Sequence, residues 1–291
     1  MRQLYYLAKA SCRGLLYLVV RIRLDSDEKA AYKLKSRQLS SAVFADGIIL
    51  SYPKSGRTWV ESMLSHLYTS RLGLPETRIL DFQDDRTVFP GLPYLFFTHD
   101  FAHATGGRWL IPKAGSRGHF RGTPTLFVVR HPIDTAVSMY FQQLRREQGI
   151  EEVGIYEFVS AHQGGLPTVI EFLNFWLEES SKIKRCKIVR YEDLSDDTFA
   201  SFRDVVRFFG FEFSDDEIRS AVDFADFGNM QKLEKSGQLS DWRFSEKAEG
   251  DVDKLKVRRG KVKGYTDYFD EEQVAALEAM VADNLNGQFG Y

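Results

Sequence analysis

Four short apolar runs constrain the fold of this chain more than any other feature of its sequence. They occupy residues 47–51, 95–98, 125–129 and 187–190. The apolar residues within each run are consecutive rather than alternating, which is typical of strands buried on both faces of a parallel sheet. The sequence therefore predicts four buried strands in one parallel sheet.

Stretches with helical spacing lie between these runs. Apolar residues recur every three to four positions over residues 59–67, 136–144 and 199–209, and Gly210 predicts the end of the third stretch. Strands that alternate with helices indicate βαβ units. No linker rich in Pro, Gly or Ser divides the 291 residues. We therefore expect an α/β fold in a single domain, with a central parallel sheet flanked by helices.

The charge balance and the cysteines narrow the class of protein. There are 39 basic and 41 acidic side chains, so net charge does not favour a nucleic-acid partner, and none is expected. The two cysteines, Cys12 and Cys186, are too few for a disulfide framework. A reducing compartment, and hence the cytoplasm, is the expected location.

We expect residues 1–45 to form an N-terminal extension that is basic at its start and helical in part. No acidic residue precedes Asp25, and the apolar run at 15–20 is too short to span a bilayer. Two interpretations stay open for residues 1–24. They form either a basic helix packed on the domain or an interfacial helix that makes a peripheral membrane contact.

The segment between the first apolar run and the next helical stretch has the design of a phosphate-binding loop. It reads Tyr-Pro-Lys-Ser-Gly-Arg-Thr-Trp over residues 52–59. Gly56 allows a turn that aims successive N–H groups at an anion, and the helix start adds a positive end. Lys54 supplies a charge and Thr58 a hydroxyl. The nucleotide loop Gly-x-x-x-x-Gly-Lys-Ser/Thr is absent, which disfavours a magnesium-dependent kinase.

A second phosphate-binding pattern follows the third apolar run. Arg130 stands at the predicted strand end, where its guanidinium can fork onto a phosphate. Pro132 and Asp134 suit the first turn of a helix, and Ser138 lies about two turns along it. Taken alone, the same residues also fit a surface arginine and an exposed serine.

Together, the two patterns resemble the cytosolic sulfotransferase family, which transfers sulfonate from 3′-phosphoadenosine-5′-phosphosulfate (PAPS). The first is similar to the family's Tyr-Pro-Lys-Ser-Gly-Thr-Thr-Trp, with Arg57 at a threonine position. The second is similar to its Arg-x-Pro-x-Asp-x-x-x-Ser pattern. The resemblance implies a P-loop NTPase-like fold, a sulfotransferase domain over residues 46–291, and PAPS as co-substrate.

Three further segments resemble family elements. They are Tyr191-Glu192-Asp193, the pair Phe227 and Met230, and Arg258-Arg259-Gly260. By resemblance, the first two lie near the adenine and the third clamps the 3′-phosphate. The cofactor-binding residues so implied are Lys54, Ser55, Gly56, Arg57, Thr58, Trp59, Arg130, Ser138, Tyr191, Phe227, Arg258, Arg259 and Gly260. The polar, charged composition of residues 236–263 predicts a mobile lid.

The reaction needs a base for the acceptor proton, and a histidine has a suitable pKa. His99 directly follows the second apolar run, and His103 is a second candidate. The family carries Lys-Thr-His here, whereas this chain has Phe-Thr-His. We expect in-line transfer with His99 as base and Lys54 stabilising the leaving phosphate. Positioning and charge can suffice for this chemistry, so no metal requirement is expected.

The acceptor is the least determined part of the function. Phe82, Phe89, Tyr94 and Phe101 suggest either an apolar pocket wall or ordinary core. A small hydroxylated compound, a lipid, a sugar or an amine all fit. The family's dimerisation signature is not recognisable, so the oligomeric state stays open. Two alternative functions are a nucleotide-dependent kinase and a non-catalytic adenine-nucleotide or membrane-binding protein.

Overall fold

The computed structural model describes residues 41–100, 104–105, 108–109, 117–146, 153–161, 163–240, 244 and 255–291. The chain divides into two compact units, Met1–Phe44 and Ala45–Tyr291, and the second contains the central sheet. The membrane interpretation of residues 1–24 lies outside the described residues. Within the described part, no helix is both long and apolar enough to cross a membrane.

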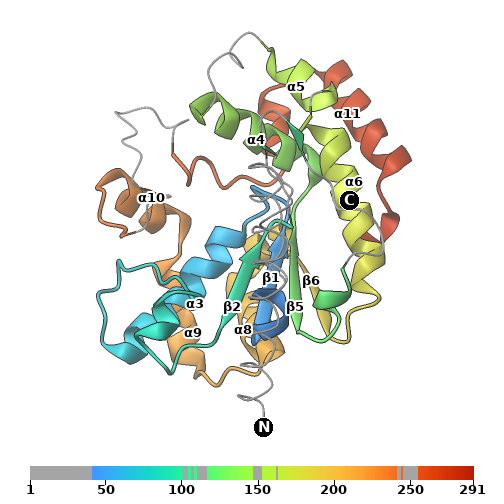
Figure 1. Cartoon of the computed structure of the whole chain (residues 1–291). Coiled ribbons are helices and arrows are strands. Elements are labelled where there is room, and N and C mark those ends of the chain that lie inside the picture. Colours follow the sequence, from blue (N-terminus) through green and yellow to red (C-terminus); the bar gives the residue numbers. More distant parts are fainter. Residues whose placement is uncertain are drawn as a thin grey trace, which may run out of the picture. The chain divides into compact units, whose positions relative to one another are not determined.

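A parallel sheet of four strands forms the centre of the second unit (Figure 1). The strands are β1 (Gly47–Ser51), β2 (Leu95–Thr98), β5 (Thr125–Val129) and β6 (Cys186–Arg190), in the spatial order β2-β1-β5-β6. All three neighbouring pairs are parallel. The predicted parallel sheet is therefore confirmed. A separate two-stranded antiparallel ladder joins β3 (Ala104–Thr105) and β4 (Arg108–Trp109).

The strands of the sheet differ in how deeply they are buried. Every residue of the central strands β1 and β5 is buried, as their continuous apolar sequences predict. The prediction of a buried strand is wrong for β6, where Ile188 is 37% exposed. In β6 the apolar run is only Ile188 and Val189, and charged residues flank it, whereas the other edge strand, β2, is apolar over most of its length and is largely buried.

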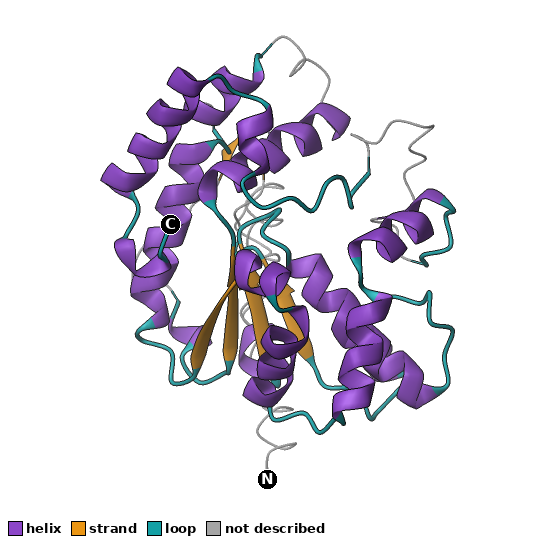
Figure 2. Ribbon diagram, turned by 180° about the vertical axis from the view of Figure 1, so that it is seen from behind, coloured by secondary structure: helices purple, strands orange, loops and turns teal. Residues whose placement is uncertain are grey.

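Helices cover both faces of the sheet (Figure 2). The described α-helices are α3 (Arg57–Leu72), α4 (Pro132–Arg146), α5 (Ile155–Ala161), α6 (Leu166–Ser180), α7 (Tyr191–Asp196), α8 (Thr198–Phe209), α9 (Asp215–Phe224), α10 (Phe227–Lys235) and α11 (Glu271–Asn284). The three predicted helical stretches correspond to α3, α4 and α8. Gly210 ends α8 in the left-handed conformation, with φ 76°, as predicted.

Alternate residues of β5 build two different core regions. Leu126 and Val128 join the apolar cluster beneath α3, α8 and α9. Phe127 faces the opposite way and packs on Phe172 and Trp176 of α6. The sheet is thus held from both sides, so the loops after its strands start from rigid points.

The aromatic residues considered for an acceptor pocket lie mainly in this core. Phe82 is fully buried, and Phe89 packs against the same apolar cluster as Leu126. The Tyr94 hydroxyl accepts a bond from Gln83 Nε2 at 3.5 Å. Phe101 lies outside the described residues. The core interpretation is therefore correct for Phe82 and Phe89.

Candidate functional site

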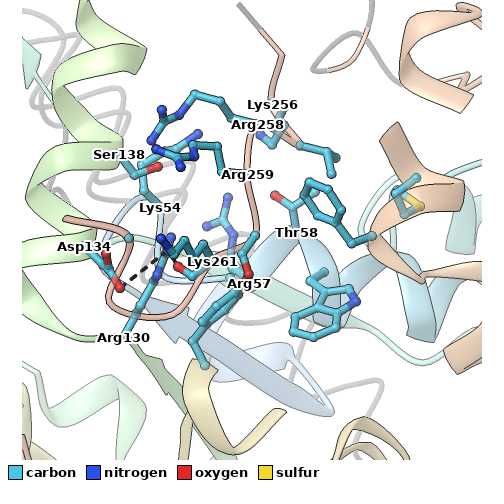
Figure 3. Close-up of a pocket in the computed structure, with 18 of the residues that line it drawn as sticks. Lys54, Arg57, Thr58, Arg130, Asp134, Ser138, Lys256, Arg258, Arg259 and Lys261 are labelled. Carbon is cyan, nitrogen blue, oxygen red and sulfur yellow. Dashed lines mark hydrogen bonds and ion pairs between the residues drawn. The ribbon is translucent and has the colours of Figure 1, made fainter. Parts of the chain in front are cut away.

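The loops after the strands and the C-terminal segment surround a pocket of about 770 Å³. Parallel strands end at one edge, so polar residues that follow different strands come together there. The predicted site residues that line the pocket are Lys54, Gly56, Arg57, Thr58, Trp59, His99, Arg130, Ser138, Tyr191, Phe227, Arg258, Arg259 and Gly260. Ser55 is buried and does not line it. Basic side chains from several segments gather around one space (Figure 3).

The loop after β1 presents the N-terminus of α3 to the pocket. Gly56 is the N-cap residue, with φ 97°, and no described side chain caps this helix end. The first N–H groups of a helix have no intrahelical acceptor, so they are available to an anion. A Cβ at Gly56 would lie 2.7 Å from Cδ2 of Tyr191. Both the backbone conformation and the close approach therefore require glycine.

His99 follows β2 and meets the end of β1. Its Nδ1 lies 2.8 Å from the carbonyl oxygen of Ser51. A carbonyl oxygen can only accept, so Nδ1 carries the proton and donates it. The other ring nitrogen, Nε2, is then unprotonated in the neutral ring and can take up a proton.

Asp100 anchors the backbone beside His99. Its carboxylate is fully buried and accepts from Nε of Arg117 at 2.5 Å. Burial raises the pKa of Asp100 to about 7, against the opposing effect of Arg117. The Asp100 N–H donates to Oγ1 of Thr98 at 2.9 Å. The other candidate base, His103, lies outside the described residues.

Arg130 projects from the end of β5 into the opposite side of the pocket. Its guanidinium lies 4.4 Å above the ring of Tyr191, and its Nη2 donates to the carbonyl of Lys261 at 3.1 Å. The Nε atom is buried and has no hydrogen-bond partner among the described residues. A buried donor without a partner fits a site for an anionic ligand.

Asp134, in the first turn of α4, ties this helix to the C-terminal segment. Its two carboxylate oxygens accept from the N–H groups of Lys263 at 2.8 Å and Tyr265 at 3.0 Å. Burial raises the pKa of Asp134, and Arg130 opposes this rise. The carboxylate therefore positions backbone near Arg130, and its Oδ2 lies 3.9 Å from the Arg130 guanidinium.

The segment Arg258-Arg259-Gly260 closes the pocket from the C-terminal side. Gly260 has φ 61°, and a Cβ there would lie 2.5 Å from the ring of Phe227. The Tyr191 hydroxyl donates to its carbonyl at 3.1 Å. Arg258 stacks 4.0 Å from the ring of Phe141, and both arginines bond to the hydroxyl of Tyr268. The two guanidiniums are thus held on one wall of the pocket.

Aromatic side chains form another wall. The Trp59 indole donates to the carbonyl of Ala225 at 2.8 Å and packs on Tyr191, with ring centroids 5.5 Å apart. The ring of Phe227 is 37% exposed, and Met230 lies beside it on α10. Such surfaces suit a flat ring system such as a nucleobase.

Charge in the pocket is strongly positive although the whole chain carries −2. The basic residues of the described lining are Lys54, Arg57, Arg130, Lys256, Arg258, Arg259 and Lys261, and its acidic residues are Asp134 and Asp226. An anion-binding loop, further arginines and an aromatic wall together suit a ligand with a flat ring and more than one anionic group.

The sulfotransferase-domain family model matches residues 121–289, more than half of the chain. This chain belongs to the sulfotransferase family. Cytosolic sulfotransferase 14 of Arabidopsis thaliana is 23% identical over 94% of this chain and 84% of that protein. Flavonol 3-sulfotransferase of Flaveria bidentis is 24% identical over 87% and 86%.

Solved structures of similar fold are sulfotransferases and a related enzyme. Mouse sulfotransferase SULT7A1 complexed with PAP has a TM-score of 0.54 at 17% identity, over 84% of this chain and 87% of that chain. Retinol dehydratase in complex with retinol and PAP gives 0.55 at 15% identity, over 82% and 80%. The predicted fold class and the predicted class of enzyme, a PAPS-dependent sulfotransferase, are confirmed. The kinase alternative is therefore dropped.

Several residues in or behind the wall of the sulfotransferase pocket carried no signal in the sequence. Arg117, which holds Asp100, sits in a segment without a recognisable motif. Glu234 and Gln231 on α10 resemble ordinary solvent-facing helical residues, yet both contact the segment before Gly260. Their contacts join positions that are distant along the chain, so no local pattern reveals them. Lys256 was detectable only as part of a generally basic stretch.

Proposed function

We propose that this sulfotransferase moves a sulfonate group in line from PAPS to the hydroxyl of a small-molecule acceptor. His99 is the general base, and Lys54 stabilises the leaving phosphate. One observation carries the proposal: His99 and Lys54, which follow neighbouring strands, line the same pocket as Arg130 and Arg258.

The donor's two phosphate groups match the two cationic sides of the pocket. The loop from Lys54 to Thr58 and the open N-terminus of α3 suit the 5′-phosphosulfate. Arg130, with its buried Nε, suits the 3′-phosphate together with Ser138 and the segment 258–260. The aromatic wall of Trp59 and Phe227 suits the adenine between them.

The transfer step uses the hydrogen bond of His99. The acceptor oxygen attacks sulfur while its proton moves to Nε2 of His99, the nitrogen left unprotonated by the bond to Ser51. The bond from sulfur to the 5′-phosphate oxygen breaks, and PAP leaves with that electron pair. Lys54 and the N–H groups at the start of α3 offset the charge that develops on the leaving phosphate.

The acceptor is proposed to be an apolar molecule with a hydroxyl group. Retinol dehydratase, similar in fold, has been solved with retinol and with androsterone, and both are compounds of this kind. We also propose a cytoplasmic location, which agrees with the names of the cytosolic relatives. The membrane contact of residues 1–24 stays a prediction, and liposome sedimentation with and without these residues tests it.

Transfer of radiolabelled sulfonate from PAPS to a panel of hydroxylated acceptors tests the function. We expect Lys54→Ala and His99→Ala each to reduce turnover by about two orders of magnitude. His99→Gln keeps a polar side chain without a base and is expected to be equally slow. Lys187→Ala on the edge strand β6, whose ammonium pairs with the exposed Asp204 away from the pocket, is the control and is expected to behave as wild type.

Two outcomes would contradict the proposal. Near-normal turnover in His99→Ala with unchanged PAP affinity would show that another residue is the general base. Wild-type protein that binds PAP but transfers to no acceptor in the panel would favour a binding protein.

A further inference from the structure

A buried carboxylate on α10 accepts hydrogen bonds from the backbone just before the segment Arg258-Arg259-Gly260. Glu234 is only 6% exposed, and its two carboxylate oxygens accept from the N–H groups of Lys256 at 2.6 Å and Val257 at 2.8 Å. Hydrogen bonds to a charged acceptor in a buried place are among the stronger ones. Glu234 thus fixes the direction in which the chain enters the pocket.

Gln231, one turn earlier on α10, holds the carbonyl groups of the same stretch. Its Nε2 donates to the carbonyl oxygens of Val257 at 3.1 Å and Arg258 at 3.3 Å. Its Oε1 accepts from Nζ of Lys235 at 3.0 Å, which fixes the orientation of the amide. The two side chains together bind both N–H and C=O groups of residues 256–258.

The start of α10 contacts the other end of this stretch. The ring of Phe227 meets Gly260 so closely that a Cβ there would lie 2.5 Å away. Phe227 and Glu234 are seven residues apart, about 10 Å along the helix. One short helix therefore carries an aromatic ring of the pocket and also holds the backbone that carries Arg258 and Arg259.

We propose that Glu234 and Gln231 are positioning residues that hold Arg258-Arg259-Gly260 against the 3′-phosphate of the donor. They thereby set the preference for a 3′-phosphorylated nucleotide over the same nucleotide without that phosphate. This inference rests on the proposed function, because it takes the segment 258–260 to face the 3′-phosphate. Guanidinium groups bind phosphate only in a narrow range of geometries. If the backbone that carries Arg258 and Arg259 is no longer held in place, their binding to the 3′-phosphate should weaken.

The test compares two ligands that differ only in the 3′-phosphate. Binding of PAP and of adenosine 5′-phosphate is measured by calorimetry with the full chain, as wild type and as Glu234→Gln. The amide nitrogen in Glu234→Gln faces an N–H group, so at least one bond to Lys256 or Val257 is lost. We expect PAP affinity to fall roughly tenfold and affinity for adenosine 5′-phosphate to stay within about twofold.

Two further variants make the test decisive. Gln231→Ala removes the bonds to both carbonyls without stranding a buried charge, and we expect the same selective loss of PAP affinity. If Glu234→Gln does not fold, the comparison of Gln231→Ala with wild type still tests the inference. Glu171→Gln makes the same chemical change on an exposed position of α6 and is expected to bind both ligands as wild type does. In steady-state assays the KM for PAPS should rise while kcat is preserved.

Each remaining outcome overturns the inference in a recognisable way. An unchanged affinity ratio in the variants shows that α10 does not position the segment. An equal loss for both ligands shows a general structural role. A wild-type protein that binds both ligands equally refutes the 3′-phosphate assignment in the proposed function, and the positioning role fails with it.

Discussion

At the residue scale, His131 is an ionisable side chain kept neutral by the fold. Its ring is buried, stacks on Tyr265 at 5.1 Å and meets the ring of Tyr291 at 5.2 Å. Burial lowers its pKa to about 4, and the nearby positive charge of Lys263 adds to this effect. The residue follows Arg130 directly, so its protonation would add charge beneath the pocket.

The stability of the protein should therefore depend on pH through His131. Above pH 6.5 the ring is neutral in both the folded and unfolded states, and its contribution is fully present. As pH falls from about 6.5 towards 4, only the unfolded chain gains the proton, and stability is lost, by roughly 3 kcal/mol. We expect His131→Phe, which keeps an aromatic ring, to lack this component.

Urea unfolding of both proteins between pH 4 and pH 8 measures the effect. The difference in free energy of unfolding between wild type and His131→Phe isolates this histidine from other groups that titrate in the same range, including Asp100. A difference that stays constant with pH would contradict the prediction.

At the scale of elements, α3 offers a matched pair of glycines. Gly56 at its start and Gly73 at its end both have positive φ, 97° and 64°. A Cβ at Gly56 would lie 2.7 Å from Cδ2 of Tyr191, whereas a Cβ at Gly73 would have no neighbour within 4 Å. Substitutions at the two positions therefore distinguish the effect of backbone strain alone from the added effect of a steric clash in the pocket.

Substitution of these glycines by alanine should have different effects. We expect Gly73→Ala to cost about 1 kcal/mol of stability and to leave PAP affinity unchanged. Gly56→Ala should cost more and should weaken PAP binding by at least about tenfold, because Tyr191 and the anion loop must shift. Denaturant unfolding and calorimetry test both; equal behaviour of the two variants would refute a special role for Gly56.

The elements that the sequence predicted best are those with a local signal. Residues 47–51, 95–98 and 125–129 are strands with the predicted bounds, because a continuous apolar run is readable without knowing its neighbours. The exposure of Ile188 was not predictable from its apolar run, since it depends on which elements pack against β6 in the fold. For the same reason, the contacts of Glu234 with residues 256 and 257 could be recognised only in the folded structure.

At the scale of the whole molecule, charge is unevenly distributed. The net charge is −2, yet seven basic and two acidic residues line the described pocket. Attraction of an anionic ligand then depends on local fields, which salt screens within about 8 Å at physiological ionic strength. We expect PAP affinity to fall several-fold between about 0.05 and 0.3 M salt, and affinity for adenosine 5′-phosphate to fall less.

Calorimetry over a salt series checks this prediction. The comparison of the two ligands removes general effects of salt on the protein. Identical salt dependence of PAP and adenosine 5′-phosphate would contradict a separate cationic site for the 3′-phosphate.

The candidate site was predictable from the sequence to the extent that it is made of loops after strands. Lys54, His99 and Arg130 each follow an apolar run. Because the carboxyl ends of parallel strands meet at one edge of a sheet, this was enough to predict that the three residues lie in one site. Arg117 obeys no such rule. Its partner Asp100 is adjacent to His99, but the ion pair joins residues 17 apart across a connection that carries no motif.

The order of the strands separates two tasks within one molecule. Of the residues that we propose to bind the donor, Lys54, Arg130 and Tyr191 follow β1, β5 and β6, whereas the proposed base, His99, follows the edge strand β2. On this proposal, we expect substitutions of residues next to His99 to affect the acceptor side of the reaction and to leave the nucleotide half intact. Such an arrangement would let the acceptor side of the site change while the donor side stays the same.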